Sequence, residues 1–418
     1  MSWEKVKIEA LCIKVTSGGT PKTSNSSYYE PAEIPWLKTA EVKDCRILET
    51  ENFISKKGLE NSSAKFIPAN CVIVAMYGET AARVAINKIA LTTNQACCNL
   101  IIDAAKADYN FVYYALVYSY ESLVALKFGG AQQNLNAAII KNYEIPLPDL
   151  PTQKRIASIL SAYDDLIEVN RKQIKLLEEA AERLYRDWFI DLHFPGHENT
   201  PIIDGLPQGW KKGKLGDVIG YDIGGGWGSE TRETSDSKPA YVIRGTDFHC
   251  VTDGSITTIP YRFHTESNLK SRLLQDGDII FEVSGGSKTE GAARTVYVTN
   301  ALLQQLNAPA ICASFCKLVR AKERSFAKYL FDTFQYLRKT DQTRKFDKYS
   351  AGNIVNYRWQ DFLNQQMIII PESALLKEYT KIVENLYENI QTLAKQISQA
   401  QSARDLLLPK LMNGEINL

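Results

Sequence analysis

Two glycine-rich segments of this 418-residue sequence are the first places where phosphate chemistry would be sought. A phosphate-cradling loop follows the pattern GxxxxGK[ST], because its glycines let backbone N–H groups wrap around the phosphate. Before Lys288 and Thr289, the two glycine positions of this pattern hold Glu282 and Ser287. The other segment, residues 224–228, lacks the GxGxxG spacing of a dinucleotide-binding turn, and we predict a flexible loop there.

Motifs of other enzyme classes are missing from the sequence as well. It contains no [DNS]PP[YF] tetrapeptide of an adenine methyltransferase, no Pro-Asp followed by Glu-x-Lys as in a common nuclease core, and no GxSxG. The eight cysteines lack CxxC spacing, and His193 and His197 lack a second pair of zinc ligands. We therefore predict no catalytic residue, no metal site and no disulfide framework.

The composition is that of an ordinary folded protein. Hydrophobic residues make up 44% and charged residues 23% of the sequence, close to the average of globular domains. No apolar stretch approaches the ~18 residues of a membrane span, and the first residues do not resemble a signal peptide. We expect a cytoplasmic protein of about two to three domains.

The net charge of +1 is unevenly distributed along the chain. Residues 1–149 are neutral overall, 150–207 carry a net charge of −3, 208–371 of +5, and 372–418 of −1. A basic excess in one globular segment permits binding to nucleic acid but does not demand it, because many solvated domains carry such a charge.

The most informative feature of the sequence is a repeat of about 205 residues. Each copy alternates short β-branched runs with Gly, Pro and Asn turns, followed by a helix near 108–128 or 325–348, which predicts a mixed α/β domain. The matched segments, in order, are 3–13 and 209–219, 35–41 and 241–247, 71–78 and 278–285, 81–83 and 292–294, 97–102 and 315–320, 111–116 and 326–331, and 144–148 and 367–371.

A long helix is predicted after each copy. Its apolar residues alternate spacings of four and three, the a/d pattern of a coiled coil, and more than four heptads favour helix pairing over packing on the parent domain alone. Asn170 and Arg404 occupy core positions, where a polar residue fixes the register. The residues predicted to pair the helices are Ile156, Leu160, Tyr163, Ile167, Asn170, Ile174, Leu177, Leu184, Val383, Leu386, Ile390, Leu393, Ile397 and Leu407.

These elements predict an α+β fold class. Two mixed α/β domains, related by a pseudo-two-fold axis, are separated by two long antiparallel coiled-coil helices. The predicted boundaries are 1–149 for the first domain, 150–190 for the central helix, 191–207 for a linker, 208–371 for the second domain and 372–418 for the C-terminal helix. Helices of about 39 residues would be roughly 58 Å long and could hold the two domains at a set separation.

Several segments also carry a family resemblance. They are SGGTPKT (17–23), IPWLKTAEV (34–42), IVAMYGET (73–80), TNQACCNLI (93–101), GGAQQNL (129–135), IPLPDLPTQKRIASIL (145–160) and AERLYRDWFID (181–191). With these segments the chain closely resembles, over essentially its whole length, the specificity (S) subunits of type I restriction-modification systems. The resemblance implies two target-recognition domains, each reading one half of a bipartite DNA site, and helices that set the spacer between the halves.

The resemblance further implies that the chain is not itself an enzyme but directs adenine methylation and DNA cleavage by other subunits. The expected partners are double-stranded DNA, two modification (methyltransferase) subunits and restriction (translocase and nuclease) subunits, with no membrane. S-adenosylmethionine, ATP and Mg are expected on those partners, and no cofactor on this chain. The second domain departs from the first at nearly every loop, as expected if it reads another sequence.

Reading B-DNA requires side chains that reach base edges, with Arg or Lys for guanine and Asn or Gln for adenine, and cations or hydroxyls for phosphate. We select candidates from loops rich in these types, although any one of them can equally be a solvated loop residue. The predicted DNA-binding residues are Ser17, Thr20, Lys22, Lys38, Tyr77, Thr80, Arg83, Gln132, Gln133 and Asn134 in the first domain, and Arg232, Lys238, Arg244, Ser284, Lys288, Thr289, Arg294, Lys345, Lys348 and Tyr349 in the second.

Two other functions remain open at the level of sequence. A stand-alone restriction or modification enzyme is disfavoured by the missing catalytic motifs, and methylation by the purified chain with S-adenosylmethionine alone would revive it. A coiled-coil adaptor that binds only proteins is disfavoured by the two loop-rich domains, and DNA footprinting of the reconstituted complex would decide.

Overall fold

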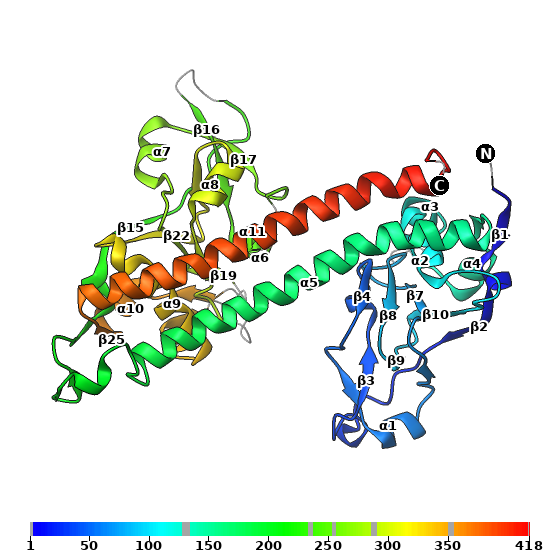
Figure 1. Cartoon of the computed structure of the whole chain (residues 1–418), viewed down its shortest axis with the longest axis horizontal. Coiled ribbons are helices and arrows are strands. Elements are labelled where there is room, and N and C mark those ends of the chain that lie inside the picture. Colours follow the sequence, from blue (N-terminus) through cyan, green and yellow to red (C-terminus); the bar gives the residue numbers. More distant parts are fainter. Residues whose placement is uncertain are drawn as a thin grey trace. The chain divides into compact units, whose positions relative to one another are not determined.

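The computed structural model of the chain describes residues 3–127, 134–232, 237–252, 256–285, 291–349, 355–416 and 418. The chain forms two compact units, Met1–Asp165 with Ala400–Leu418, and Leu166–Gln399. Each unit contains one mixed α/β domain and a part of both long helices (Figure 1). Within the described ranges, no helix is long and apolar enough to cross a membrane.

The first domain is built on two main sheets. β-branched and aliphatic strands that are buried on both faces, such as VIVA in β7, pack between the other sheet and the helices. The five-stranded sheet has the order β2 (Cys12–Ser17), β10 (Cys97–Ile102), β7 (Val72–Ala75), β8 (Val84–Asn87) and β4 (Cys45–Ile47). The four-stranded sheet has the order β5 (Phe53–Ile54), β3 (Ile34–Leu37), β9 (Leu91–Thr93) and β6 (Phe66–Ile67), and β1 (Lys5–Lys7) pairs with β11 (Glu144–Pro146).

Helices cover the five-stranded sheet of the first domain. The helix expected near 108–128 is divided into α2 (Tyr109–Tyr118) and α3 (Tyr120–Ala125), with Ser119 between them. Asp108 caps α2, because its carboxylate accepts a hydrogen bond from the N–H of Phe111 at 3.0 Å. The remaining helices are α1 (Lys56–Glu60) and α4 (Ala137–Asn142).

The second domain repeats this plan with different details. Its four-stranded sheet has the order β15 (Ile219–Gly224), β22 (Cys316–Ala321), β18 (Ile279–Glu282) and β20 (Thr295–Tyr297). Smaller sheets are β17 (Tyr261–His264), β16 (Lys238–Ile243) and β21 (Ala310–Cys312); β14 (Lys211–Lys214) and β25 (Met367–Ile370); β19 (Ser284–Gly285), β24 (Val355–Tyr357) and β23 (Asp347–Tyr349); and the hairpin β12 (Ile202–Ile203) and β13 (Leu206–Pro207). The helices are α6 (Phe248–Thr252), α7 (Glu266–Arg272), α8 (Asn300–Leu306), α9 (Arg324–Lys339) and α10 (Trp359–Gln365).

The two domains share one topology, in agreement with the sequence repeat. The order β15-β22-β18-β20 corresponds strand by strand to β2-β10-β7-β8. The expected match of 97–102 with 315–320 is wrong by one residue, because Cys97 and Cys316 close the same turn and are opposite Ala75 and Glu282, so Ala96 corresponds to Phe315. The match extends to the backbone, because Ala82 and Ala293, the second alanines of the two Ala-Ala-Arg segments, both adopt the left-handed region with φ of 78° and 70°. This conformation is uncommon for alanine, so its recurrence shows that both hairpin turns are built in the same way.

The long helices α5 (Leu150–Phe189) and α11 (Ser373–Met412) run antiparallel and contact each other (Figure 1). In the first unit, Ile156 and Leu160 near the start of α5 share a hydrophobic core with Leu408 and Leu411 near the end of α11. In the second unit the opposite ends meet, where the ring centroids of Trp188 and Tyr379 are 5.7 Å apart. The ends of both helices therefore belong to the domain cores.

Polar residues cross between the two helices inside this apolar seam. Asn170 is 3% exposed and donates from Nδ2 to Oε1 of Gln396 at 3.1 Å. In the first unit, Nη1 of Arg404 lies 2.6 Å from Oδ1 of Asp164, which is also buried. Of the predicted pairing residues, Ile156, Leu160, Ile167, Asn170, Ile174, Val383, Ile390 and Ile397 are buried, and Tyr163, Leu177, Leu184, Leu386, Leu393 and Leu407 are partly buried.

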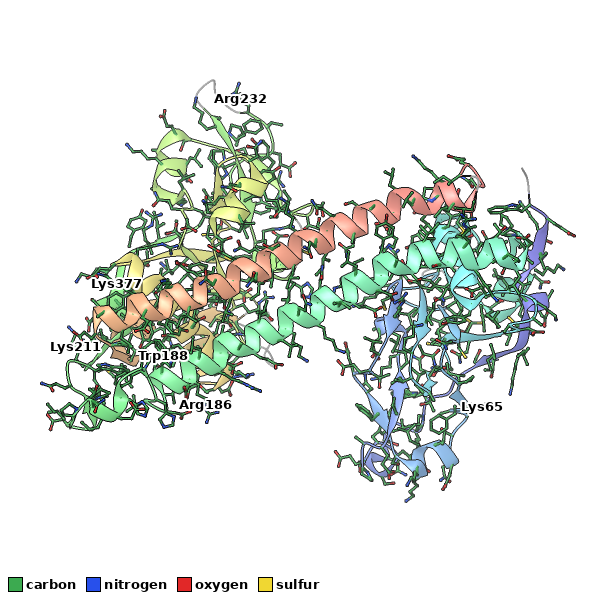
Figure 2. All side chains as sticks on the ribbon, viewed as in Figure 1. Lys65, Arg186, Trp188, Lys211, Arg232 and Lys377 are labelled. Carbon is green, nitrogen blue, oxygen red and sulfur yellow. The ribbon has the colours of Figure 1, made fainter. Side chains whose placement is uncertain are left out.

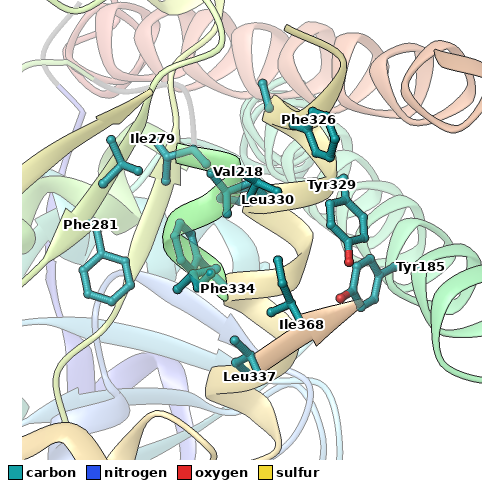
Figure 3. Packing of buried hydrophobic residues seen from close by; sticks show 14 of the residues in the cluster. Tyr185, Val218, Ile279, Phe281, Phe326, Tyr329, Leu330, Phe334, Leu337 and Ile368 are labelled. Carbon is teal, nitrogen blue, oxygen red and sulfur yellow. The ribbon is translucent and has the colours of Figure 1, made fainter. Parts of the chain in front are cut away.

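The core of the second unit is rich in aromatic residues and joins α5 to the domain. Figure 3 shows Tyr185 of α5 facing Tyr329 of α9, next to Phe334 and Ile368. The hydroxyl of Tyr185 donates to Oγ1 of Thr333 at 3.1 Å, so its polar group is satisfied inside the core. Packing of this kind holds the C-terminal part of α5 against the second domain.

Lys328 on α9 is a cation buried in this core. Its Nζ lies 4.2 Å from the ring centroid of Tyr297, 4.5 Å from that of Phe331, and against the ring of Tyr387. Among the described residues it has no hydrogen-bond partner. Burial lowers the pKa of Lys328 to about 7, although the carboxylate of Asp332 acts in the opposite direction.

Replacing Lys328 with Met is expected to stabilise the chain and to flatten the pH dependence of its stability. Burial lowers the pKa of Lys328 to about 7 in the folded chain, whereas the unfolded chain keeps an ordinary lysine pKa of about 10.4. Between these values the unfolded chain binds more protons, so the wild-type stability contributed by this group rises with pH. At pH values below the pKa of Lys328 in the folded chain, the folded chain bears the whole free-energy cost of the buried charge.

Thermal unfolding of the full chain near pH 6 and near pH 9 measures this effect. We expect Lys328→Met to unfold a few degrees higher than wild type at the lower pH, because ~1 kcal/mol shifts Tm by about 2–4 °C at this domain size. The difference should shrink at the higher pH. The control Lys322→Met removes an exposed lysine just before α9 and should leave the pH dependence unchanged. A lower Tm for Lys328→Met at both pH values would contradict the prediction.

Candidate nucleic-acid interface

Most of the predicted DNA-binding residues of the first domain lie at one end of its five-stranded sheet. At this end β2 and β7 finish and β8 and β10 begin, because the neighbouring strands are antiparallel, with Ser17 opposite Cys98 and Cys97 opposite Ala75. We call residues 17–20, 76–84 and 94–97 the loop end of the first domain. Segments far apart in the sequence meet here.

The bend after β2 depends on two glycines. A Cβ on Gly18 would collide with the carbonyl of Thr93, and the N–H of Gly19 donates to that same carbonyl at 2.9 Å. This approach ties the bend to β9 of the other sheet and requires a residue without a side chain at position 18. Thr20 follows directly, and its hydroxyl donates to the amide oxygen of Gln95.

The turn between β7 and β8 carries Tyr77 and Thr80. Tyr77 is 41% exposed, whereas the hydroxyl of Thr80 donates to a main-chain carbonyl at 2.6 Å. The N–H of Leu135 donates to the carbonyl of Met76 at 2.9 Å, which brings the preceding residue, Asn134, to the same end of the sheet. Three predicted residues from two separate segments therefore lie close together.

Arg83 lies at this loop end but is held by its own domain. Its Nη1 is 2.5 Å from Oδ2 of Asp44, and the guanidinium lies 3.9 Å from the ring centroid of Tyr120. Burial lowers the pKa of Arg83, but the hydrogen bond and charge of Asp44 outweigh it and raise the pKa above its ordinary value. Asp44 also accepts a hydrogen bond from the N–H of Val84 at 2.9 Å, so the pair fixes the start of β8.

The second domain has an equivalent loop end, formed by residues 224–227, 282–285, 292–295 and 313–316. The N–H groups of Gly225 and Gly226 donate to the carbonyls of Cys316 and Cys312, both at 2.9 Å, and a Cβ on Gly225 would collide with the main chain of Ala313. The prediction of a flexible loop is therefore wrong for these two glycines. They form the same closely packed bend as Gly18 and Gly19.

A small β-ribbon extends the second loop end. β19, β24 and β23 form a three-stranded sheet in which Ser284 is opposite Asn356, and Asn356 is opposite Lys348. The hydroxyl of Ser284 donates to Oδ1 of Asn356 at 2.9 Å. Lys348 is exposed and Tyr349 is 48% exposed. A cation, an amide and an aromatic ring are thus presented on neighbouring strands, which suits contacts to phosphate and to base edges.

The predicted arginines Arg294 and Arg244 at this loop end are engaged within the domain. Arg294 donates from Nε and Nη2 to both carboxylate oxygens of the buried Glu282, at 2.8 and 2.5 Å. Arg244 makes a similar pair with Asp247 at 2.9 and 2.7 Å, whose hydrogen bond raises the pKa of Arg244. Both guanidinium groups therefore stabilise turns, which makes them weaker candidates for bidentate contacts to guanine.

The remaining predicted residues lie outside the ranges that define the two loop ends. Lys22 is exposed in the long loop after the first bend. Lys38 borders the first loop end, because the carbonyl of Leu37 accepts a hydrogen bond from the N–H of Asn94 at 3.0 Å, and its Nζ donates to Oδ1 of Asn52 at 2.8 Å. Arg232 is exposed beside the sheet of β16 and β17 (Figure 2), and Lys238 is the exposed first residue of β16. Lys345 is exposed in the turn that leads into β23. Gln132, Gln133, Lys288 and Thr289 lie outside the described residues.

Several residues of the loop ends were not selected from the sequence. Gln95 and Asn356 are amides, the residue type expected for adenine. No Gly or Pro marks a loop next to Gln95 in TTNQACC, and Asn356 stands singly between Val355 and Tyr357. Trp227 and Phe315 are 40% and 63% exposed, although aromatic residues ordinarily predict a core. The glycines before Trp227 were the signal that could have indicated its position.

Positive charge is concentrated beside the second loop end. Residues 338–358 contain six basic and two acidic side chains, which accounts for +4 of the +5 net charge of residues 208–371. Such a concentration attracts the phosphate backbone of nucleic acid regardless of its sequence. The positive charge of residues 338–358 therefore lies in the same part of the domain as the exposed ribbon of β19, β24 and β23.

The arrangement offers binding groups rather than reactive ones. Burial raises the pKa of Cys71, Cys98 and Cys312 to about 12, so these thiols stay protonated near neutral pH. In the described ranges, no cluster of three or more His, Cys, Asp or Glu side chains could hold a metal ion. What the loop ends present is a set of hydroxyl, amide, ammonium and aromatic groups.

Comparisons with known proteins agree with this geometry. A family profile described as "Type I restriction modification DNA specificity domain" matches residues 1–179. The type I restriction enzyme MjaIX specificity subunit of Methanocaldococcus jannaschii is 27% identical over 432 residues, which span 100% of this chain and 94% of that protein. The MjaVIII specificity subunit of the same organism is 22% identical over 427 residues, spanning 100% and 93%.

A solved structure shows the same fold. The crystal structure of the type I restriction-modification S subunit from M. genitalium matches with a TM-score of 0.58 at 18% sequence identity, covering 98% of this chain and 96% of that one. The chain belongs to the specificity (S) subunits of type I restriction-modification systems. It is a DNA specificity subunit and a non-catalytic component of such a system, so the family and the fold class predicted from the sequence are confirmed.

Replacing Lys348 with Ala is expected to weaken binding to all DNA sequences alike. A lysine on an exposed ribbon contacts phosphate as a point charge, so its loss should reduce the slope of log K against log salt by about one. The measurement is the Kd of the assembled complex on specific and unrelated DNA over a range of salt concentrations. Lys211→Ala is the control, because Lys211 lies on β14 at the other end of the domain (Figure 2). An unchanged slope, or a loss on one sequence alone, would contradict the assignment.

Proposed function

We propose that the two domains read the two halves of a bipartite DNA site, each through its loop end. In this proposal the loop end of the first domain reads one half and the loop end of the second domain reads the other. The recognised site then directs adenine methylation and cleavage by the partner subunits. The chain supplies sequence recognition in the cytoplasm and no chemistry of its own.

The observation that carries this proposal is a shared backbone with different side chains. The two loop ends have the same strand order, the same glycine bend and the same left-handed alanine. At matching positions, however, the first domain has Thr20 and Ala96, whereas the second has Trp227 and Phe315. Different side chains on a common frame are expected if each frame reads its own DNA sequence.

The long helices offer surfaces for partner subunits. On the part of α5 in the second unit, Leu166, Val169 and Leu176 are 44%, 52% and 61% exposed, beside the buried seam. Exposed apolar side chains on a helix that is already paired are typical of a protein interface. We propose that two modification subunits dock on these helices and that restriction subunits join the complex. S-adenosylmethionine, ATP and Mg belong to those subunits.

The helices also suit the role of a spacer. Each has 40 residues, and a straight helix of that size is about 60 Å long at 1.5 Å per residue. The polar contacts Asn170–Gln396 and Arg404–Asp164 fix the register of the pair, because a shift of either helix would leave buried polar groups unpaired. A pair of fixed register and length would set the number of base pairs between the two half-sites.

Exchange of one domain tests the division of labour. Replacing residues 1–149 with the matching domain of another S subunit should change one half of the methylated motif and leave the other half and the spacer unchanged. Separate domains make separate base contacts, whose free energies add when the sites are far apart. The measurement is the genome-wide map of methylated adenines in cells that express the hybrid with its modification subunits. Changes in both halves would contradict the proposal.

Lengthening both helices together tests the spacer. Four residues inserted after Arg171 in α5 and four after Ala394 in α11 keep the apolar faces approximately in phase and add ~6 Å. Because B-DNA rises ~3.4 Å per base pair, the spacer of the methylated motif should grow by one or two base pairs.

A matched control uses two inserted residues at the same positions, which rotate the seam by about 200° and should abolish pairing and activity. An active four-residue variant with the original spacer would show that the helices do not measure the gap.

A further inference from the structure

Phe315 stands out at the loop end of the second domain. Its side chain is 63% exposed, although its main chain is held from both sides. The carbonyl of Phe315 accepts hydrogen bonds from the N–H groups of Val283 and Ser284 at 2.9 and 3.1 Å, and Cys316 N–H closes the turn on the carbonyl of Ala313 at 2.8 Å. A fixed backbone therefore holds an apolar ring toward solvent.

The first domain shows that this turn does not need a phenylalanine. In the equivalent turn, the N–H of Cys97 donates to the carbonyl of Asn94 at 3.2 Å, and the carbonyl of Ala96 accepts from the N–H of Met76 at 2.8 Å. Ala96 stands where the second domain has Phe315, and it is 6% exposed. Two of the three hydrogen bonds therefore form with a methyl side chain as well, so closing of the turn does not explain the ring.

The neighbours of Phe315 are groups that suit the major groove of DNA. Ser284 is hydrogen-bonded to the exposed Asn356, and the exposed Lys348 and Tyr349 lie on the adjacent strand β23. In the major groove, hydroxyl and amide groups meet base donors and acceptors, and the apolar group on the base edges is the 5-methyl of thymine. An apolar ring held among polar side chains matches that pattern.

We propose that Phe315 contacts the 5-methyl group of a thymine in the half-site read by the second domain. This inference rests on the proposed function of the loop end. It predicts that the second half-site contains a thymine on one strand, and that the contact is lost when that methyl group is absent. The first domain makes no such contact at the matching position, because Ala96 is too short and is buried.

Substitution of uracil for thymine removes the methyl group without changing base pairing. The Kd of the wild-type S subunit, assembled with its modification subunits, is measured on DNA in which each thymine of the two half-sites is replaced singly by uracil. We expect one position of the second half-site to weaken binding about fourfold, the loss expected for one buried methyl-sized group. Phe315→Ala should weaken binding to natural DNA by at least as much and be insensitive to uracil at that position.

Matched variants separate the contact from a structural effect. Met367→Ala removes another exposed apolar side chain, on β25 at the far end of the domain, and should retain the uracil effect. Phe315→Ala should keep the wild-type Tm, because Ala96 supports the same turn. The inference is overturned if the second half-site holds no thymine, or if uracil at no position weakens binding of the wild-type protein. It is also overturned if Phe315→Ala keeps the uracil effect. A variant that binds natural DNA more weakly, when the wild-type protein shows no uracil effect, would indicate that Phe315 stacks between bases instead. If the wild-type complex bound all DNA sequences equally well, the proposed function itself would be overturned.

Discussion

The close approach of a two-glycine bend to the neighbouring sheet is the constraint on which each loop end depends. In both domains the bend is hydrogen-bonded to a strand of the second sheet, and a Cβ at its first glycine would collide with that strand's main chain or with the turn just after it. The two sheets are thereby locked at the place where the loops emerge. The residue that follows the bend, Thr20 or Trp227, is carried at a fixed position whatever its side chain.

Charged groups at the loop ends divide into two kinds. Arg83, Arg294 and Arg244 are paired with carboxylates of their own domains, and these pairs fix turns rather than offering free cations. Lys345 and Lys348 are exposed on the ribbon side of the second domain. Lysine suits this position because its compact charge attracts phosphate without demanding one geometry. Under the proposed function, turn stability and DNA affinity would therefore be carried by different basic residues.

The helices combine two kinds of packing. Their ends are part of the domain cores, where aromatic residues such as Trp188 and Tyr379 pack together. Between those ends, the seam includes Asn170–Gln396 in one unit and Arg404–Asp164 in the other. Burial lowers the pKa of Arg404, but the charge and hydrogen bond of Asp164 outweigh this and raise it, so Arg404 keeps its charge in this contact. Such pairs contribute more to the choice of register than to stability.

The sequence by itself determined the plan of the molecule. The internal repeat showed two domains of one topology, and the spacing of apolar residues showed two long helices, because both signals are local and periodic. The family resemblance, whose most specific segments lie between residues 17 and 191, led to the correct family. These predictions required no knowledge of which segments meet in space.

Only the tertiary structure decided which candidate residues lie together. It brought Ser17, Tyr77 and Asn134 to one sheet end, since antiparallel strands return distant segments to the same edge. It turned the supposed flexible glycine loop into a packed bend, and it placed Phe315 in solvent where an aromatic residue predicts a core. An ion pair such as Arg294 with Glu282 forms only where two strands place the side chains next to each other. Composition and spacing along the chain do not predict such contacts.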